Sequence, residues 1–500
     1  MTAGDRPQHN WQARAALAIM VLFGIVLTLH AELSRLNLDE YGDMVENYAW
    51  GVLWQWGYFK HPPFFGWLVA AWFSILPHVD WIYYLFASLN VVVALLLLWR
   101  IASRYGDSGF QLFVILCAVV VPAFSFQAIK YNANSAMTPV WAGVFLFYLR
   151  GLEARRWYDA LALGILVGIA MLTKYHSVVL VGALFIHAVM DREARSILLS
   201  SFGLIVALAS VAIFAGHLIW LFENDFLPIT YAAEQGDGVV VHIVSSLALF
   251  LGGMLVYLLP ALGLALLLRS PNDGYPFLWL GRLSGFRTTV EGRALLAFGL
   301  WPTVLTIALA FAASADLNLA WVLPVFLPLV VLVAALLPPD LINRNIARAL
   351  IAIGLYFVAL LVSAPIYRES VRGGTRLNMT VPVKAMSAQL DEYWRQYGGG
   401  DDPVIAGDFL LANAMSFYSR YSPITLEANS LSVSKGYIDK AELERRGMMI
   451  ICREGDGSCA GLSRELTGGL SDVVTIPFSI TGFDGERQWP FVVTIAKPLG

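Results

Sequence analysis

The sequence predicts an α-helical polytopic membrane protein with about eleven transmembrane helices, exterior juxtamembrane helices and a C-terminal α/β domain. Composition is the first observation behind this prediction: 58% of the 500 residues are hydrophobic and 14% are charged, whereas soluble domains carry about 25% charged residues. The second is the recurrence of long apolar runs. The third is a change of character after Pro365, where glycines, charges and strand-like alternation replace the apolar runs.

Eleven apolar runs have about the length of a membrane span, which needs about 20 residues. A twelfth run, from Phe64 to Leu76, is shorter and rich in Trp and Phe, so we expect it to lie at the membrane interface. The predicted spans lie near 14–33, 81–101, 110–128, 136–150, 158–173, 175–190, 199–221, 243–268, 294–313, 319–337 and 346–366.

Positive charges predict the orientation of these spans, because cytoplasmic loops are enriched in Lys and Arg. With a cytoplasmic N-terminus, the opposite loops up to the last span hold only Arg35, Lys60, Lys130 and Lys174. The C-terminal part then lies outside. The predicted cytoplasmic loops hold Arg100, Arg104, Arg150, Arg155, Arg156, Arg192, Arg195, Arg269, Arg282, Arg287, Arg293, Arg344 and Arg348.

The chain is predicted to have two domains, a transmembrane module over 1–366 that includes a first exterior loop at 34–80, and a soluble domain over 367–500. A helix is expected over Leu377 to Tyr397. The spacing of Cys452 and Cys459 favours a local disulfide in an oxidising exterior, and Cys117 is expected to be inert packing in a span. Expected strands are 404–408, 448–452, 473–480 and 491–495.

The most informative segment follows the first span. Asp39, Glu40, Asp43 and Glu46 lie within eight residues of one another next to the bilayer. Charge at membrane depth is costly, so such a cluster indicates a functional site. A solvated connector between helices is the alternative, but a plain connector needs neither the aromatic residues nor the Lys60-His61-Pro62-Pro63 corner that follow.

Unusual polar residues near span ends all map to the predicted exterior face. A carboxylate there could take a proton from an attacking hydroxyl, and Lys or His could hold a phosphate leaving group. Group transfer from a lipid phosphate donor is therefore expected. The residues are Asp39, Glu40, Lys60, His61, Lys130, Asn132, Asn134, Lys174, Tyr175, His176, His217, Glu223, Asn224, Asp225, Asp316 and Asn318.

The Asp39-Glu40 pair with the Lys-His-Pro-Pro-x-x-x-Trp corner resembles the GT-C superfamily of integral-membrane glycosyltransferases. The resemblance is to the bacterial branch of family 39, near the aminoarabinose and galacturonic acid transferases of lipid A and the protein O-mannosyltransferases. The stretches from Lys130 to Asn134, Leu172 to Tyr175 and Asn318 to Pro328 are also similar to that branch, so the resemblance covers roughly residues 10–366.

The resemblance implies inverting transfer of a sugar from a polyprenyl-phosphate donor to an envelope glycan, lipid A, another lipid or a protein. It places the reaction at the periplasmic face of a bacterial inner membrane and implies no nucleic-acid partner. Asp39 would be the general base and Glu40 would orient a loop or donor group. The donor phosphate would bind Lys60, His61 and Lys174. The substrate-binding residues would be Tyr41, Lys130, Asn132, Asn134, Tyr175, His176, Glu223 and Asp225.

One position departs from that family pattern. Many relatives carry a second Asp in the loop before the fourth span, and this chain has Asn134 there. An amide cannot act as a base, so Asn134 is expected to hydrogen-bond sugar or acceptor. A divalent metal held by the carboxylates and His61 stays open, although no tight ligand spacing supports it.

Other interpretations stay open for single residues and for the whole chain. Asp39 could be a helix N-cap, and Lys60, Lys130 and Lys174 could be interfacial anchors. A glycolipid transporter would explain the spans without chemistry, but it predicts midplane charges and repeated halves, and the sequence has neither. A non-catalytic glycolipid-binding protein is the third class.

Overall fold

The computed structural model describes residues 11–234, 240–269, 276–434, 436–468 and 472–498. The chain divides into two compact units. The first contains residues 1–28, 87–223 and 229–360, and the second contains 29–86, 224–228 and 361–500. The second unit therefore combines the loop after the first span with the C-terminal part of the chain.

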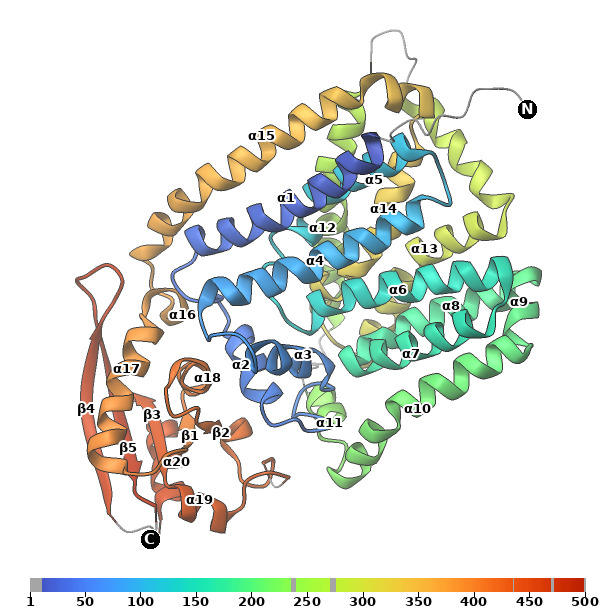
Figure 1. The fold of residues 1–500 in the computed structure, drawn as a ribbon. Helices are drawn as coiled ribbons and strands as arrows, with labels where there is room; N and C mark the ends of the chain where they lie inside the picture. Colours follow the sequence, from blue (N-terminus) through green and yellow to red (C-terminus); the bar gives the residue numbers. More distant parts are fainter. Residues whose placement is uncertain (1–10, 235–239, 270–275, 435, 469–471, 499–500) are drawn as a thin grey trace. The chain divides into compact units, whose positions relative to one another are not determined.

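Apolar helices build the first unit (Figure 1). They are α1 (Trp11–Ser34), α4 (Asp80–Ala102), α5 (Ser108–Val120), α6 (Ala133–Ala154), α7 (Trp157–Thr173), α8 (Val178–Met190), α10 (Ser201–Glu223), α11 (Leu227–Glu234), α12 (Val240–Leu267), α13 (Val290–Ala313), α14 (Phe326–Ala335) and α15 (Pro339–Arg372). Parts of α1, α4, α11 and α15 belong to the second unit. The short helix α9 (Arg192–Leu198) is polar. Short 3-10 segments are η1 (Pro122–Phe124), η2 (Tyr175–Ser177), η3 (Pro276–Arg287) and η4 (Leu319–Val325).

Six helices among the described residues are long and apolar enough to cross a membrane: α1, α4, α10, α12 from Val244, α13 and α15. Several of the other predicted spans are shorter apolar helices, among them Ser108–Val120 and Trp157–Thr173. The count of eleven spans stays a prediction.

The span predicted over 110–128 is wrong at its C-terminal end. Helix α5 stops at Val120, and Val121 is extended, with φ −78° and ψ 127°. Pro122 explains this end, because proline disfavours the helical conformation in the residue before it. The chain continues as the short η1 segment instead.

Helices α7 and α10 approach each other closely through glycines. A side chain at Gly164 would meet the Val206 carbonyl oxygen at 2.6 Å, and one at Gly168 would meet Ile213 at 2.6 Å. Ser210 donates a hydrogen bond to the Gly164 carbonyl at 3.0 Å. Such small-residue contacts are a common means of packing helices in membranes. This packing fixes α7, which ends at Thr173, just before the predicted site residue Lys174.

The second unit contains a five-stranded sheet with strand order β2-β1-β3-β5-β4. Strand β1 is parallel to β2 and β3, whereas β5 is antiparallel to β3 and β4. The elements are α2 (Asp43–Gly51), α3 (Phe64–Phe73), α16 (Leu377–Thr380), α17 (Val383–Tyr393), the π-helical turn η5 (Trp394–Gly398), β1 (Val404–Gly407), α18 (Phe409–Tyr418), β2 (Ile424–Thr425), η6 (Glu427–Asn429), α19 (Lys440–Arg446), β3 (Met448–Arg453), α20 (Gly457–Thr467), β4 (Val473–Thr481) and β5 (Gln488–Ala496).

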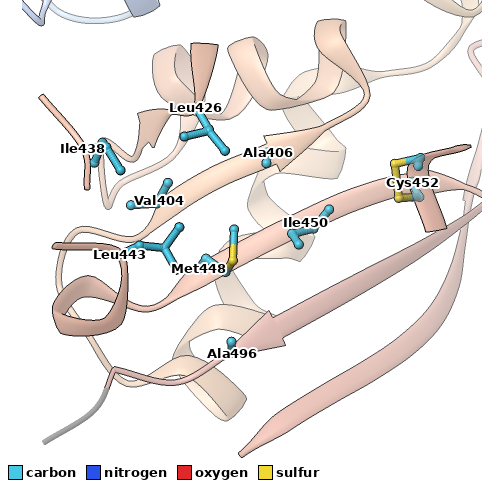
Figure 2. Packing of buried hydrophobic residues seen from close by; sticks show 10 residues of the cluster. Val404, Ala406, Leu426, Ile438, Leu443, Met448, Ile450, Cys452 and Ala496 are labelled. Carbon is cyan, nitrogen blue, oxygen red and sulfur yellow. A yellow bond between two sulfur atoms is a disulfide. The ribbon is translucent and has the colours of Figure 1, made fainter. Parts of the chain in front are cut away.

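Alternate residues of β1 and β3 form a hydrophobic cluster on one face of this sheet (Figure 2). Val404 and Ala406 of β1 lie beside Met448 and Ile450 of β3, because successive side chains of a strand point to opposite faces. The cluster also contains Leu426, Ile438, Leu443, Ala496 and the two cysteines Cys452 and Cys459. These cysteines form the predicted disulfide, and Cys117 is buried and free.

The loop after α1 is anchored within the second unit by hydrogen bonds to the C-terminal segment. The Asn37 amide donates to the carbonyls of Asn378 and Val381, both at 2.8 Å. The Tyr418 hydroxyl donates to Asp80 at 2.7 Å. Helix α2 also contacts α18. The first loop is therefore held in a defined conformation.

Candidate active site

Asp39 lies in a tight turn between α1 and α2. Its Oδ1 accepts backbone N–H bonds from Tyr41 at 2.8 Å, Gly42 at 2.7 Å and Asp43 at 3.2 Å, and Oδ2 accepts one from Met44 at 2.7 Å. Gly42 has φ +81°, a conformation that favours glycine. The side chain is 4% exposed. Asp39 thus caps the start of α2, and the turn fixes its orientation.

Burial raises the pKa of Asp39, and the neighbouring Asp43 charge adds to this effect. The backbone donors oppose it because they stabilise the ionised form. Oδ2 accepts a single hydrogen bond from the described residues, so it retains capacity for a further proton donor. Asp39 can therefore both cap the start of α2 and act as the proposed base.

Asp39 and Glu40 line a hollow with an empty volume of about 260 Å³. Glu40 accepts a hydrogen bond from the Tyr367 hydroxyl at 2.7 Å. Arg35, Asn37 and Asn378 contribute further polar groups, so the hollow could receive a hydroxylated group beside the Asp39 carboxylate. Its other lining residues are Ser34, Leu36, Val371 and Met379.

Lys60 forms an ion pair with Glu46 of α2, with 2.8 Å between Nζ and Oε1. Its ammonium also lies over the ring of Phe409, 4.5 Å from the ring centre. Burial raises the pKa of Glu46 to about 7 even though Lys60 lowers it. Glu46 therefore holds Lys60, a predicted phosphate-binding residue, in place. Because the pKa of Glu46 is about 7, Glu46 gains or loses its proton near neutral pH.

Glu427, in η6 after β2, is a buried acid that the sequence does not predict as a site residue. Its Oε1 accepts a short hydrogen bond from the Phe59 backbone N–H. Burial raises the pKa of Glu427 to about 8, and Glu46 adds to the rise. A polar residue just after a predicted strand would indicate a site. Strand β2, which precedes Glu427, has only two residues, so the sequence does not reveal the strand and Glu427 is missed.

The remaining predicted residues of the first exterior loop are less enclosed. The ring centre of His61 lies 5.8 Å from that of Phe65 and 6.0 Å from that of Trp50. Its backbone carbonyl accepts a hydrogen bond from the Tyr58 N–H at 3.0 Å. Tyr41 is exposed. Both residues belong to the second unit, like Asp39, Glu40 and Lys60.

Other predicted residues belong to the first unit. Asn132 caps α6 by accepting N–H bonds from Asn134 at 3.0 Å and Ser135 at 3.2 Å. The Lys174 ammonium donates a short hydrogen bond to the Asn134 side-chain oxygen. The Lys130 carbonyl accepts a bond from the Ser135 hydroxyl at 3.2 Å. The structure thus brings Lys130, Asn132, Asn134 and Lys174 into one hydrogen-bonded group.

Tyr175 and His176 follow Lys174 and bond to different helices. The Tyr175 hydroxyl is 2.7 Å from Nε2 of His217, and Nε2 of His176 is 3.0 Å from the Thr306 hydroxyl. Glu223 at the end of α10 and Asp225 after it are both exposed. No group of three or more metal-ligating side chains occurs in the described parts of the chain.

Comparison with known proteins gives one family match and several structural matches. Residues 60–220 match the family described as dolichyl-phosphate-mannose-protein mannosyltransferase. The structure resembles ArnT from Cupriavidus metallidurans bound to undecaprenyl phosphate, with a TM-score of 0.59 and 16% identity over 96% of this chain and 97% of that one. The apo form of that ArnT gives the same TM-score at 17% identity. These structural matches show that the chain has the ArnT fold.

The ArnT-like fold confirms the predicted fold class, a multi-pass helical membrane protein with a small C-terminal sheet domain. The oligosaccharyltransferase of Archaeoglobus fulgidus is a more distant match, with a TM-score of 0.44 and 13% identity over 89% of this chain and 69% of that one. No curated protein sequence matches the chain significantly.

Proposed function

We propose that this protein transfers a sugar, with inversion, from a polyprenyl-phosphate donor to a hydroxyl group of an envelope acceptor at the periplasmic face of the bacterial inner membrane. Asp39 takes the proton of the acceptor hydroxyl, and the acceptor oxygen forms a bond to the anomeric carbon. The bond between that carbon and the phosphate oxygen breaks, and the polyprenyl phosphate leaves with the bonding electrons.

The observation that carries the proposal is the buried Asp39 carboxylate, fixed by four backbone N–H groups beside a hollow with further polar groups. A general base needs a fixed geometry and a pKa near the working pH, and burial moves the Asp39 pKa in that direction. ArnT, which has the same fold, is known bound to undecaprenyl phosphate, which supports a donor of that class.

Three side chains are proposed to bind the donor phosphate because they are, or can become, positively charged. Lys60, His61 and Lys174 would stabilise the negative charge that develops on the leaving phosphate. Glu40 would orient the acceptor side of the hollow through its bond to Tyr367. The substrate-binding roles of Tyr41, Lys130, Asn132, Asn134, Tyr175, His176, Glu223 and Asp225 stay proposals, as does the predicted domain boundary at 366.

The test is Asp39→Asn in membranes that contain a polyprenyl-phosphate sugar and an acceptor extract. Asn keeps one oxygen for the N–H groups of Tyr41, Gly42 and Asp43 but turns an amide toward Met44, so folding should lose about 1–2 kcal/mol. Sugar transfer should fall at least 100-fold, because general-base catalysis contributes about 10²–10⁴-fold. Transfer is measured as radiolabelled sugar in the acceptor fraction.

Asp43→Asn is the matched control, because Asp43 is a neighbouring carboxylate in the same turn. It should keep most of the transfer activity. Normal turnover by Asp39→Asn, or an equal loss in both variants, would remove Asp39 as the base.

A further inference from the structure

A second hollow, with an empty volume of about 520 Å³, lies within the second unit. Residues from α2 and the first loop line it together with residues from β1, β2, α18 and η6. The lining residues are Glu46, Ala49, Trp50, Phe59, Lys60, Gly407, Phe409, Ala412, Asn413, Thr425, Leu426, Glu427, Ala428 and Asn429.

The hollow lies at the carboxyl ends of the parallel strands β1 and β2, which end at Gly407 and Thr425. Open α/β sheets bind their ligands outside the carboxyl ends of parallel strands. Its position in the sheet therefore points to a ligand, independently of the side chains that line it.

The backbone around these strand ends is held in uncommon conformations. Gly407 has φ +112°, and a side chain there would meet the Ile451 carbonyl oxygen at 2.1 Å. Ala428 and Asn429 have φ +48° and +55°. The Asn429 amide fixes the arrangement by bonding both the N–H and the carbonyl of Gly407, at 2.9 and 3.0 Å. Conformations of this kind cluster at ligand sites.

Buried polar groups in the lining have capacity left for a ligand. In the part of the chain that the structure describes, Glu46 and Glu427 each bond through one carboxyl oxygen, to Lys60 and to the Phe59 N–H. Both residues are 8% exposed. The Thr425 hydroxyl is buried and has no hydrogen-bond partner among the described residues, although buried hydroxyls are normally paired.

The chemistry of the lining favours an uncharged polar ligand. Lys60 is paired with Glu46. Burial raises the pKa of Glu427 to about 8, so Glu427, Thr425 and the amides present uncharged polar groups near neutral pH. The acids, amides and hydroxyl disfavour a purely apolar ligand. Phe409 is 43% exposed and offers a ligand the part of its ring that Lys60 does not cover. Hydroxyl groups and an apolar ring face are the ligand features that fit together here.

We propose that this hollow is a sugar-binding subsite in which Glu427, Thr425 and Asn413 bind hydroxyl groups and Phe409 packs against the ring. The inference deepens the proposed function and takes from it only the expectation that the substrates carry sugars. It gives the C-terminal sheet a direct part in substrate binding.

The test measures binding of methyl mannoside, methyl galactoside and methyl glucoside to the full chain by saturation-transfer NMR, in a detergent without a sugar headgroup. At least one glycoside should bind, and Thr425→Val and Glu427→Gln should each weaken its binding at least five-fold. Glu392→Gln is the control, because Glu392 is an exposed carboxylate paired with Arg395. It should bind the glycoside like the unmodified chain.

Thermal unfolding separates a lost ligand contact from a lost fold. Thr425→Val replaces an unpaired buried hydroxyl with a methyl group of similar shape, so its Tm should not fall. Absence of glycoside binding to the unmodified chain, or equal binding to all variants, would overturn the subsite. Binding of inorganic phosphate alone that Thr425→Val abolishes would also overturn it, in favour of an anion site.

A sugar 1-phosphate distinguishes the two sources of the sugar. Tighter binding of mannose 1-phosphate than of methyl mannoside assigns the subsite to the donor, and the reverse order assigns it to the acceptor. Either result sustains the subsite. The experiment also separates failure of the subsite from failure of the proposed function. A chain that binds no glycoside in this hollow could still show sugar transfer that depends on Asp39.

Discussion

At the residue scale, Glu46 and Glu427 show how burial changes the acid–base behaviour of a carboxyl group. The pKa of Glu427 is raised from 4.5 to about 8, so the folded chain holds a proton that the unfolded chain releases. Between these two pH values the folded state binds more protons than the unfolded state. Stability from this group is therefore fully present below pH 4.5 and is lost as the pH rises to about 8.

Glu427→Gln should remove this pH dependence. The amide keeps an oxygen for the Phe59 N–H but cannot ionise, so the variant should match the unmodified chain near pH 5 and exceed it in stability at pH 8. Each proton contributes at most about 1.4 kcal/mol per pH unit. The measurement is Tm by scanning fluorimetry from pH 5 to 8.5, with Glu392→Gln as the exposed control. Parallel Tm curves for Glu427→Gln and the unmodified chain would contradict the raised pKa.

Asp39 and Glu427 show what the sequence could and could not reveal about the site. Asp39 belongs to a dense carboxylate cluster after a span, which can be read from the sequence. Its bonds to four N–H groups depend on the left-handed turn at Gly42, and that geometry is visible only in the structure. Glu427 lies nearly 370 residues from its partner Phe59, and no local pattern indicates such a contact.

At the scale of elements, the four predicted strands are confirmed as β1, β3, β4 and β5, because each combines hydrophobic or β-branched residues with flanking turn residues. Strand β2 is missed because its two residues carry no periodicity. The helix predicted over Leu377 to Tyr397 is broken at Val381, which is extended before Pro382, for the same steric reason that ends α5 before Pro122.

The disulfide between Cys452 and Cys459 joins the end of β3 to α20. Chain-entropy arguments for a loop of this length give a stabilisation of about 2.5 kcal/mol. The double variant Cys452→Ala, Cys459→Ala should therefore lower the free energy of unfolding of the second unit by about that amount, measured by denaturant titration of the full chain.

Reduction of the unmodified chain supplies the control for this experiment. A reductant should bring its unfolding midpoint to that of the double variant and leave the variant unchanged. A midpoint that stays the same in both cases would mean that the disulfide does not constrain the unfolded state.

At the scale of the whole molecule, the proposed function predicts a binding site for a phosphorylated polyprenyl lipid. A ligand that binds only the folded state stabilises it by about 2.7 kcal/mol at a free concentration of 100 times Kd. Undecaprenyl phosphate should therefore raise the Tm of the full chain, and undecaprenol, which lacks the phosphate, should raise it much less. Equal shifts with both lipids would indicate that the chain recognises the hydrocarbon alone.

The apolar runs and the sidedness of the arginines suffice to predict a polytopic membrane fold. They do not predict the composition of the second unit, because its parts are separated in sequence by most of the membrane helices. No sequence pattern singles out Asn37 or Asn378, yet the Asn37 side chain donates a hydrogen bond to the Asn378 carbonyl. Long-range partners of this kind have no periodic or local signature.

The discontinuity of the second unit has a consequence for biosynthesis. Residues 29–86 leave the ribosome about 275 residues before residue 361, so at about 5–20 residues per second they wait roughly 15–55 s for their partner segment. During that time the Asn37 side chain has neither of its C-terminal acceptors, and the faces of α2 that later contact α18 are uncovered. The growing chain should therefore be most vulnerable to proteases before the segment from Leu361 emerges.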